Sequence, residues 1–96
     1  MTEIVAASSA GNYVEFSPVD GRKPLMRSTL AASEAALAPN GFVRTHRSWL
    51  VNAACVTAIE PEGSGDYALE LTGGMRAPVS RRYPDALAKL RAGVGA

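Results

Sequence analysis

Apolar and polar side chains alternate along parts of this chain with the period of two that is typical of β-strands. In residues 12–16, Val14 and Phe16 fall on one face of an extended chain. Residues 67–72 alternate in the same way, which indicates a half-buried strand. We expect four further strands: the short apolar segment 2–7, and residues 22–27, 56–59 and 75–79.

Turn-forming residues separate these strands. Asp20-Gly21 and Gly73-Gly74 are strong signals for tight turns between antiparallel strands. They predict one hairpin from residues 12–16 and 22–27, and a second hairpin on either side of Gly73-Gly74. Two other stretches have the composition of loops: Ser8-Ser9-Ala10-Gly11 and Pro61-Glu62-Gly63-Ser64-Gly65.

Two short helices are expected beside the strands. Ser28 or Thr29 can cap a helix over residues 30–38, and Pro39-Asn40-Gly41 stops it. A second helix is expected over residues 83–91, where a proline is tolerated in the first turn. Many short strands with one or two short helices predict a mostly β fold.

Length and composition indicate one domain. A chain of 96 residues has room for one modest core, and a hydrophobic content of 47% argues against a disordered chain. We expect a single domain over residues 1–96, with its core in about 2–91 and a frayed tail over 92–96. Cys55 is the only cysteine, which favours a reducing compartment such as the cytoplasm. We find no signal peptide and no apolar run near the ~20 residues of a membrane helix, so no membrane contact is expected.

The charges are unevenly distributed, although the formal net charge is only +1. Four acids cluster in one part of the chain: Glu60, Glu62, Asp66 and Glu70. Five arginines lie in two segments that contain no acid: Arg44, Arg47, Arg76, Arg81 and Arg82. A surface with one basic side is compatible with DNA binding.

The stretch from Gly41 to Asn52 combines cations with an apolar base. Arg44, His46 and Arg47 lie close together between apolar residues. In an extended chain Arg47 would lie on the same face as Val43. If Val43 packs inward, Arg47 could not stay solvated on that face, so the strand should end in a turn near His46 or Arg47. Cations on a loop above a rigid apolar base suit the binding of a polyanion.

This stretch also carries a family resemblance. The pattern Phe-x-Arg-x-His-Arg-Ser-x-Leu-Val-Asn, from Phe42 to Asn52, resembles the signature of LytTR-type DNA-binding domains, which are output domains of bacterial response regulators and sensors. Other segments follow in the family's order: Asn12-Tyr13-Val14, Asp20-Gly21, Thr29-Leu30, Val56 with Ile59, and Pro78-Val79-Ser80-Arg81-Arg82-Tyr83. The resemblance covers about residues 2–91.

The resemblance implies an elongated arrangement of small antiparallel β-sheets that inserts loops into the major grooves of double-stranded DNA. It implies base contacts from Arg47 and Arg82, since arginine can bind guanine through two parallel hydrogen bonds. Asn12 matches a position that can also reach a base, but an ordinary turn role suits asparagine equally well. Phosphate contacts are expected from four side chains: Arg44, His46, Arg76 and Arg81.

The resemblance also implies partners for the domain in bacterial transcription regulation. Family members tend to bind direct repeats in pairs, so a weak homodimer on DNA is expected. A sensor or receiver domain is expected in the same chain or in a separate protein.

Enzymatic and metal chemistry are disfavoured by the residues. His46, Ser48 and Cys55 are close in sequence, but no third residue stands out to orient His46. A single histidine without a second ligand makes a poor metal site, so we expect no metal and no cofactor. His46 is expected to bond the backbone or a phosphate, and Asn52 to hold a turn through backbone hydrogen bonds.

Two other functions remain open. One is a small β-rich protein-interaction module without a nucleic-acid role. The other is a binder of single strands or RNA, in which Tyr13, Trp49 and Tyr67 would stack on bases. Most of the six aromatic residues occupy apolar-face positions, which favours a core role for them.

Overall fold

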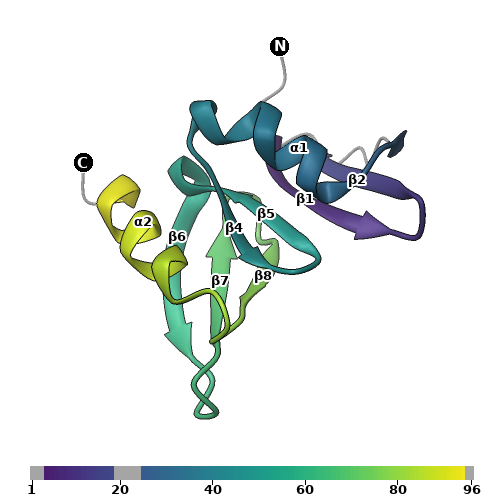
Figure 1. Ribbon diagram of the computed structural model, residues 1–96. Coiled ribbons are helices and arrows are strands. Elements are labelled where there is room, and N and C mark those ends of the chain that lie inside the picture. Colours follow the sequence, from purple (N-terminus) through teal and green to yellow (C-terminus); the bar gives the residue numbers. More distant parts are fainter. Residues whose placement is uncertain (1–3, 19–24, 95–96) are drawn as a thin grey trace.

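The chain forms two antiparallel sheets and two helices in the computed structural model, which describes residues 4–18 and 25–94 (Figure 1). The first sheet has the strand order β3-β2-β1-β5-β4. Its strands are β1 (Ile4–Ala10), β2 (Tyr13–Pro18), β3 (Leu25–Arg27), β4 (Phe42–His46) and β5 (Trp49–Asn52). The second sheet has the order β6-β7-β8, with strands β6 (Val56–Pro61), β7 (Tyr67–Leu71) and β8 (Arg76–Val79). The helices are α1 (Leu30–Leu37) and α2 (Pro84–Val94), and short 3-10 turns cover Ala38–Asn40 and Ala53–Cys55.

This architecture confirms the predicted fold class. Both sheets are antiparallel and small, and the principal extents of 33 × 25 × 23 Å make the molecule longer along one axis. Helix α1 covers the five-stranded sheet, whereas α2 lies on the other side of the molecule near β6 (Figure 1).

The five-stranded sheet separates two hydrophobic clusters. Leu50 of β5 packs with Leu30 of α1 in the first cluster. Its neighbour Val51 packs with Leu69 of β7 and Leu90 of α2 in the second. Because successive side chains of a strand point to opposite faces, β5 serves both clusters and is buried on both sides. Strand β5, which is anchored in both clusters, begins directly after the turn between β4 and β5.

Strand β1 is longer than predicted. The expected loop at Ser8-Ser9-Ala10-Gly11 is wrong for its first three residues, which continue the strand. Ser8 pairs with Glu15 of β2 on one side and with Trp49 of β5 on the other. The backbone hydrogen bonds of a central strand therefore override the loop preference of small polar residues. The true turn consists of Gly11 and Asn12, and Gly11 has a positive φ of 62°.

The predicted helix signals are confirmed. The Thr29 side chain accepts a 3.1 Å hydrogen bond from the backbone N–H of Ala32 and so caps α1. Gly41, with φ 87°, takes the left-handed conformation that ends the helical segment. Helix α2 begins at Pro84, as expected at a first helical position, but it runs to Val94, beyond the predicted end.

Both predicted hairpins agree with the described residues. β2 pairs with β3, Tyr13 lying opposite Arg27, while the Asp20-Gly21 turn and residues 22–24 of the predicted strand lie outside the described residues. β7 pairs with β8 across Gly73-Gly74, and both glycines have positive φ values. Residues 95–96 of the predicted frayed tail also lie outside the described part of the chain.

Candidate nucleic-acid interface

Three connecting segments meet at one end of the molecule. They are the β1–β2 turn at Gly11–Asn12, the β4–β5 turn at Arg47–Ser48, and the connection from β8 to α2 at residues 80–83. Ser8 of β1 lies opposite both Glu15 and Trp49, which places the first two turns at the same end of the sheet. A 3.0 Å hydrogen bond from the backbone N–H of Ser9 to the carbonyl of Ser48 joins them directly.

The third segment reaches this end from the other sheet. Its first residue, Ser80, donates a 2.8 Å backbone hydrogen bond to the carbonyl of Thr45, beside the β4–β5 turn. As a result, four side chains line one hollow of about 360 Å³: His46, Arg47, Ser80 and Arg82. Arg47 and Arg82 are both exposed. The two arginines predicted to read bases, which are far apart in sequence, therefore line the same small hollow.

A second hollow of about 610 Å³ continues from Arg47 along the first sheet. Asn12, Arg27, Arg44 and Arg47 are among the residues that line it. Arg27 is exposed and was not predicted as a site residue. Its signal in the sequence was the hairpin register: with β3 antiparallel to β2, the last residue of β3 lies opposite Tyr13, next to the Asn12 turn.

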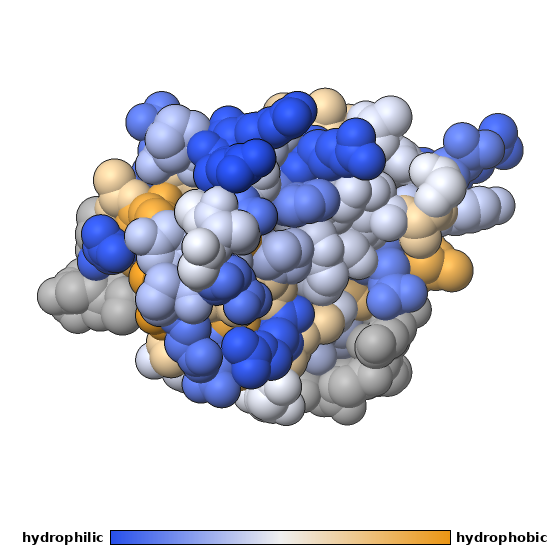
Figure 2. Space-filling model, turned by 90° about the horizontal axis from the view of Figure 1, so that it is seen from below, coloured by the Kyte–Doolittle hydropathy of each residue, from blue (hydrophilic) through white to orange (hydrophobic). Residues whose placement is uncertain are grey.

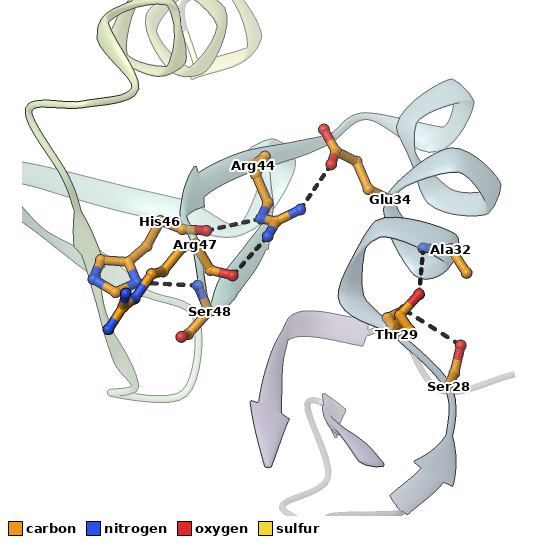
Figure 3. A network of polar contacts seen from close by, with 8 residues as sticks. All are labelled: Ser28, Thr29, Ala32, Glu34, Arg44, His46, Arg47 and Ser48. Atoms are coloured by element: carbon orange, nitrogen blue, oxygen red, sulfur yellow. Dashed lines mark hydrogen bonds and ion pairs between the residues drawn. The ribbon is translucent and has the colours of Figure 1, made fainter. Parts of the chain in front are cut away.

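Arg44 lies behind the β4–β5 turn and bonds to it (Figure 3). Its Nε donates a 2.8 Å hydrogen bond to the carbonyl of His46, and Nη2 donates one of 2.6 Å to the carbonyl of Arg47. Nη1 forms a 2.9 Å ion pair with Oε1 of Glu34 on α1. Its side chain is only 19% exposed. The predicted phosphate contact of Arg44 thus concerns a guanidinium that already uses three of its five N–H groups within the domain.

His46 and Asn52 bond the backbone as predicted. The Nδ1 atom of His46 accepts a 3.1 Å hydrogen bond from the backbone N–H of Ser48. This bond spans the turn between β4 and β5. Asn52 accepts from the backbone N–H of Ala54 at 3.1 Å and donates to the carbonyl of Ile4 at 3.0 Å. The phosphate contact of His46 remains a prediction.

Residues 80–83 are held by the loop between β6 and β7. The backbone N–H of Arg81 donates a 2.8 Å hydrogen bond to Oδ1 of Asp66, and its Nη1 donates one of 3.2 Å to the carbonyl of Ser64. The backbone N–H of Arg82 donates to Oγ of Ser80 at 3.2 Å. Arg82 itself is exposed and lines the hollow that it shares with Arg47.

Arg76 lies apart from this end of the molecule. It begins β8, whereas Ser80 follows the last residue of that strand. Its Nη2 lies 3.6 Å from Oε2 of Glu60, and both side chains are about half exposed, at 55% and 50%. The structure therefore brings Arg47, Arg82, His46 and Asn12 to one end, with Arg81 in the adjoining loop, but it does not bring Arg76 there.

The surface seen from below is predominantly hydrophilic, with apolar side chains in only a few places (Figure 2). Tyr13 is 46% exposed, whereas Trp49 and Tyr67 pack against the core. Within the described ranges, no three His, Cys, Asp or Glu side chains are grouped so that they could hold a metal ion. No helix among the same residues is long and apolar enough to cross a membrane.

Comparison with known proteins decides the family. The model of the LytTr DNA-binding domain matches residues 1–91. The chain belongs to this family. Its fold is similar to the LytTr DNA-binding domain of a putative methyl-accepting/DNA response regulator from Bacillus cereus, with a TM-score of 0.80 and 25% sequence identity. That match covers 91% of this LytTR chain and 79% of the Bacillus cereus chain.

Two regulators are similar to this LytTR domain in sequence. The sensory transduction protein LytT of Bacillus subtilis (strain 168) is 32% identical over 88 residues, which are 92% of this chain and 36% of LytT. The transcriptional regulatory protein BtsR of Escherichia coli (strain K12) is 32% identical over 83 residues, which are 86% of this chain and 34% of BtsR. The LytTR chain thus spans about a third of the length of these relatives.

Proposed function

We propose that this LytTR domain binds double-stranded DNA sequence-specifically in bacterial transcription regulation, with its loops in major grooves. The observation that supports the proposal is that Arg47 and Arg82, two exposed arginines from two different loops, line the same hollow. Each could bind O6 and N7 of a guanine through two hydrogen bonds. Two such contacts from one end of the domain would read nearby base pairs.

The remaining roles follow from position. Asn12 lines the hollow next to Arg47 and is proposed as a further base contact. His46, Arg81 and Arg27 flank these residues and are proposed to contact phosphate, which fixes the domain on the duplex without reading sequence. Arg44 and Arg76, two of the predicted phosphate contacts, are left out of this set because they face Glu34 and Glu60.

The domain is proposed to act as the output part of a regulatory system. LytT and BtsR are named as sensory transduction and transcriptional regulatory proteins, and both are about three times as long as the matched region. A receiver or sensor domain, in the same chain or in a partner, would control binding in the cytoplasm. We propose that two domains bind direct repeats as a weak homodimer on DNA. In such a pair, the hollow lined by Arg47 and Arg82 in each domain would face the DNA. The two domains would therefore contact each other through other surfaces.

A β-rich protein-interaction module is the less favoured function, because family membership and the clustered arginines both support DNA as the ligand. Single-stranded DNA and RNA are the alternative ligands against which duplex DNA should be tested. The experiment is selection of bound sequences from a random duplex pool, followed by titration with the selected duplex, a scrambled duplex, the separate strands and an RNA duplex. We expect a recurring sequence and the highest affinity for the selected duplex. Failure to enrich any sequence, or equal binding to all four probes, would contradict the proposal.

A further inference from the structure

We propose that Arg44 and Glu34 are positioning residues that set the conformation of the Arg47–Ser48 turn and thereby aim Arg47 at its base. This inference rests on the proposed function, because it concerns the residue assigned to base reading there. It changes the predicted role of Arg44 from an outward phosphate contact to an inward support. It also gives a role to Glu34, an acid close to a surface that would meet a polyanion.

Arg44 holds the turn through two hydrogen bonds. Nε and Nη2 donate to the carbonyls of His46 and Arg47, two consecutive residues at the start of the turn. A guanidinium is planar and rigid, so it holds both carbonyls in one fixed relation. Two consecutive peptide units are thereby oriented, and their orientation determines where the Arg47 side chain leaves the backbone.

The ion pair with Glu34 connects Arg44 to helix α1. Oε1 of Glu34 binds Nη1, on the side of the guanidinium that faces α1 (Figure 3). Helix α1 is itself fixed, because Thr29 caps its start and Leu30 is buried in the first hydrophobic cluster. A continuous set of contacts therefore runs from the core through α1 and Glu34 to the turn that presents Arg47.

Burial explains why Arg44 does not simply point outward. Its side chain is 19% exposed, whereas that of Glu34 is 41% exposed. A largely buried guanidinium needs a compensating charge, and a partly exposed carboxylate supplies it while remaining hydrated. Without the carboxylate, the Arg44 guanidinium would be better stabilised by turning toward solvent or a phosphate. The carbonyls of His46 and Arg47 would then lose their hydrogen-bond donors.

The two roles predict opposite effects for removal of the Glu34 charge. If Arg44 contacts phosphate, then Glu34→Gln removes a repulsive charge near DNA and frees the arginine, so binding should become tighter. If Arg44 positions the turn, then Glu34→Gln leaves the turn in its binding-competent conformation for a smaller fraction of the time. Apparent affinity then falls in proportion to that fraction. Since the pair is partly exposed, we expect a loss of roughly two- to fivefold on the selected duplex.

Asp85 provides the matched control. It is exposed, it belongs to α2, and it lines the same hollow as Glu34, Arg44 and Arg82. Asp85→Asn therefore removes the same charge at a similar place, but without any bond to the turn. A purely electrostatic effect would make both variants bind at least as tightly as the wild type. A positioning effect weakens only Glu34→Gln.

Two substitutions of Arg44 complete the experiment. Arg44→Lys keeps the charge but replaces three separate, coplanar nitrogens with one, so positioning predicts that it weakens binding. The double variant Glu34→Gln/Arg44→Lys should bind no more weakly than Arg44→Lys alone, because both changes break one network. Arg44→Ala should leave the slope of log affinity against log salt unchanged. A phosphate contact would reduce the steepness of that slope by about 0.9.

The measurement is a titration of the whole chain and its variants with the selected and scrambled duplexes at several salt concentrations. Circular dichroism at the working temperature checks that each variant is folded. Equal or tighter binding by Glu34→Gln, or a slope reduced by about one in Arg44→Ala, would overturn the positioning role. If the wild type itself prefers no duplex, the proposed function fails instead, and the two failures are distinct.

Discussion

The backbone N–H of Ser80 donates a 2.8 Å hydrogen bond to the carbonyl of Thr45. This bond joins the two sheets at the point where each sends a loop toward the proposed DNA surface. Arg47 follows Thr45 by two residues, and Arg82 follows Ser80 by two. Because the anchors are backbone groups, the spacing of the two arginines depends on the fold more than on the side chains around them.

The Thr45 side chain supports a prediction about stability. Thr45 is fully buried, and its hydroxyl is the buried side-chain atom without a hydrogen-bond partner in the described part of the chain. Thr45→Val replaces this hydroxyl with a methyl group of similar size, so we expect the free energy of unfolding to rise by about 1 kcal/mol. Urea unfolding measures it. A decrease in stability would indicate that the hydroxyl has a partner or that the core cannot accept the methyl group.

Arg47 and Arg82 are expected to read bases. Arg47→Ala and Arg82→Ala should each cost about 1–3 kcal/mol of binding free energy on the selected duplex, the usual contribution of a bidentate base contact. Both should lose much less on a scrambled duplex, since phosphate attraction carries no sequence information. Titration with both duplexes measures the difference.

The control for these two variants is Arg91→Ala. Arg91 is exposed on α2 and carries the same charge, away from the three loops. Its removal should change both affinities little. Equal losses for Arg47→Ala, Arg82→Ala and Arg91→Ala on both duplexes would leave only diffuse charge attraction.

Arg27 is expected to contact phosphate. If three or four phosphates are neutralised by the domain, log affinity should fall with log salt at a slope of about −3 to −4. Arg27→Ala should make this slope shallower by about 0.9 and should weaken selected and scrambled duplexes alike. Arg76→Ala is the matched control, because Arg76 is an exposed strand arginine at the other end of β8. A slope that changes with Arg76 but not with Arg27 would move the phosphate contacts to that end.

Asn52 is expected to stabilise the connection between the two sheets. It is buried, and its side chain bonds the carbonyl of Ile4 and the backbone N–H of Ala54. Asn52→Ala leaves both backbone groups without these partners, so we expect a loss of about 1–3 kcal/mol in unfolding free energy. Thermal or urea unfolding measures the loss. An unchanged stability would mean that water replaces the side chain at this site.

Much of the local structure could be predicted because its causes lie within a few residues. The alternation in residues 67–72, the Gly73-Gly74 turn and the Thr29 cap depend on backbone preferences and on hydrogen bonds to near neighbours. The same holds for the end of β4 at His46, where the conflict between Val43 and Arg47 required a turn. The sequence therefore indicated correctly that Arg47 lies on a loop.

The tertiary structure decided what the local patterns leave open. Ser8 to Ala10 became a strand because β2 pairs with all three residues and β5 with Ser8. Arg44 has Glu34 as its partner only because α1 packs beside β4. The position of each arginine relative to the proposed DNA surface likewise depends on contacts between segments that are distant in sequence.

The sequence by itself determined the family, most of the strands and helices, and the two loops that carry Arg47 and Arg82. Only the tertiary structure decided which cations lie together: Arg47 with Arg82, and Arg27 beside Asn12, whereas Arg76 is elsewhere. The physical reason is that secondary structure follows from local conformational preferences. The proximity of loops follows instead from sheet register and core packing, which join residues far apart along the chain.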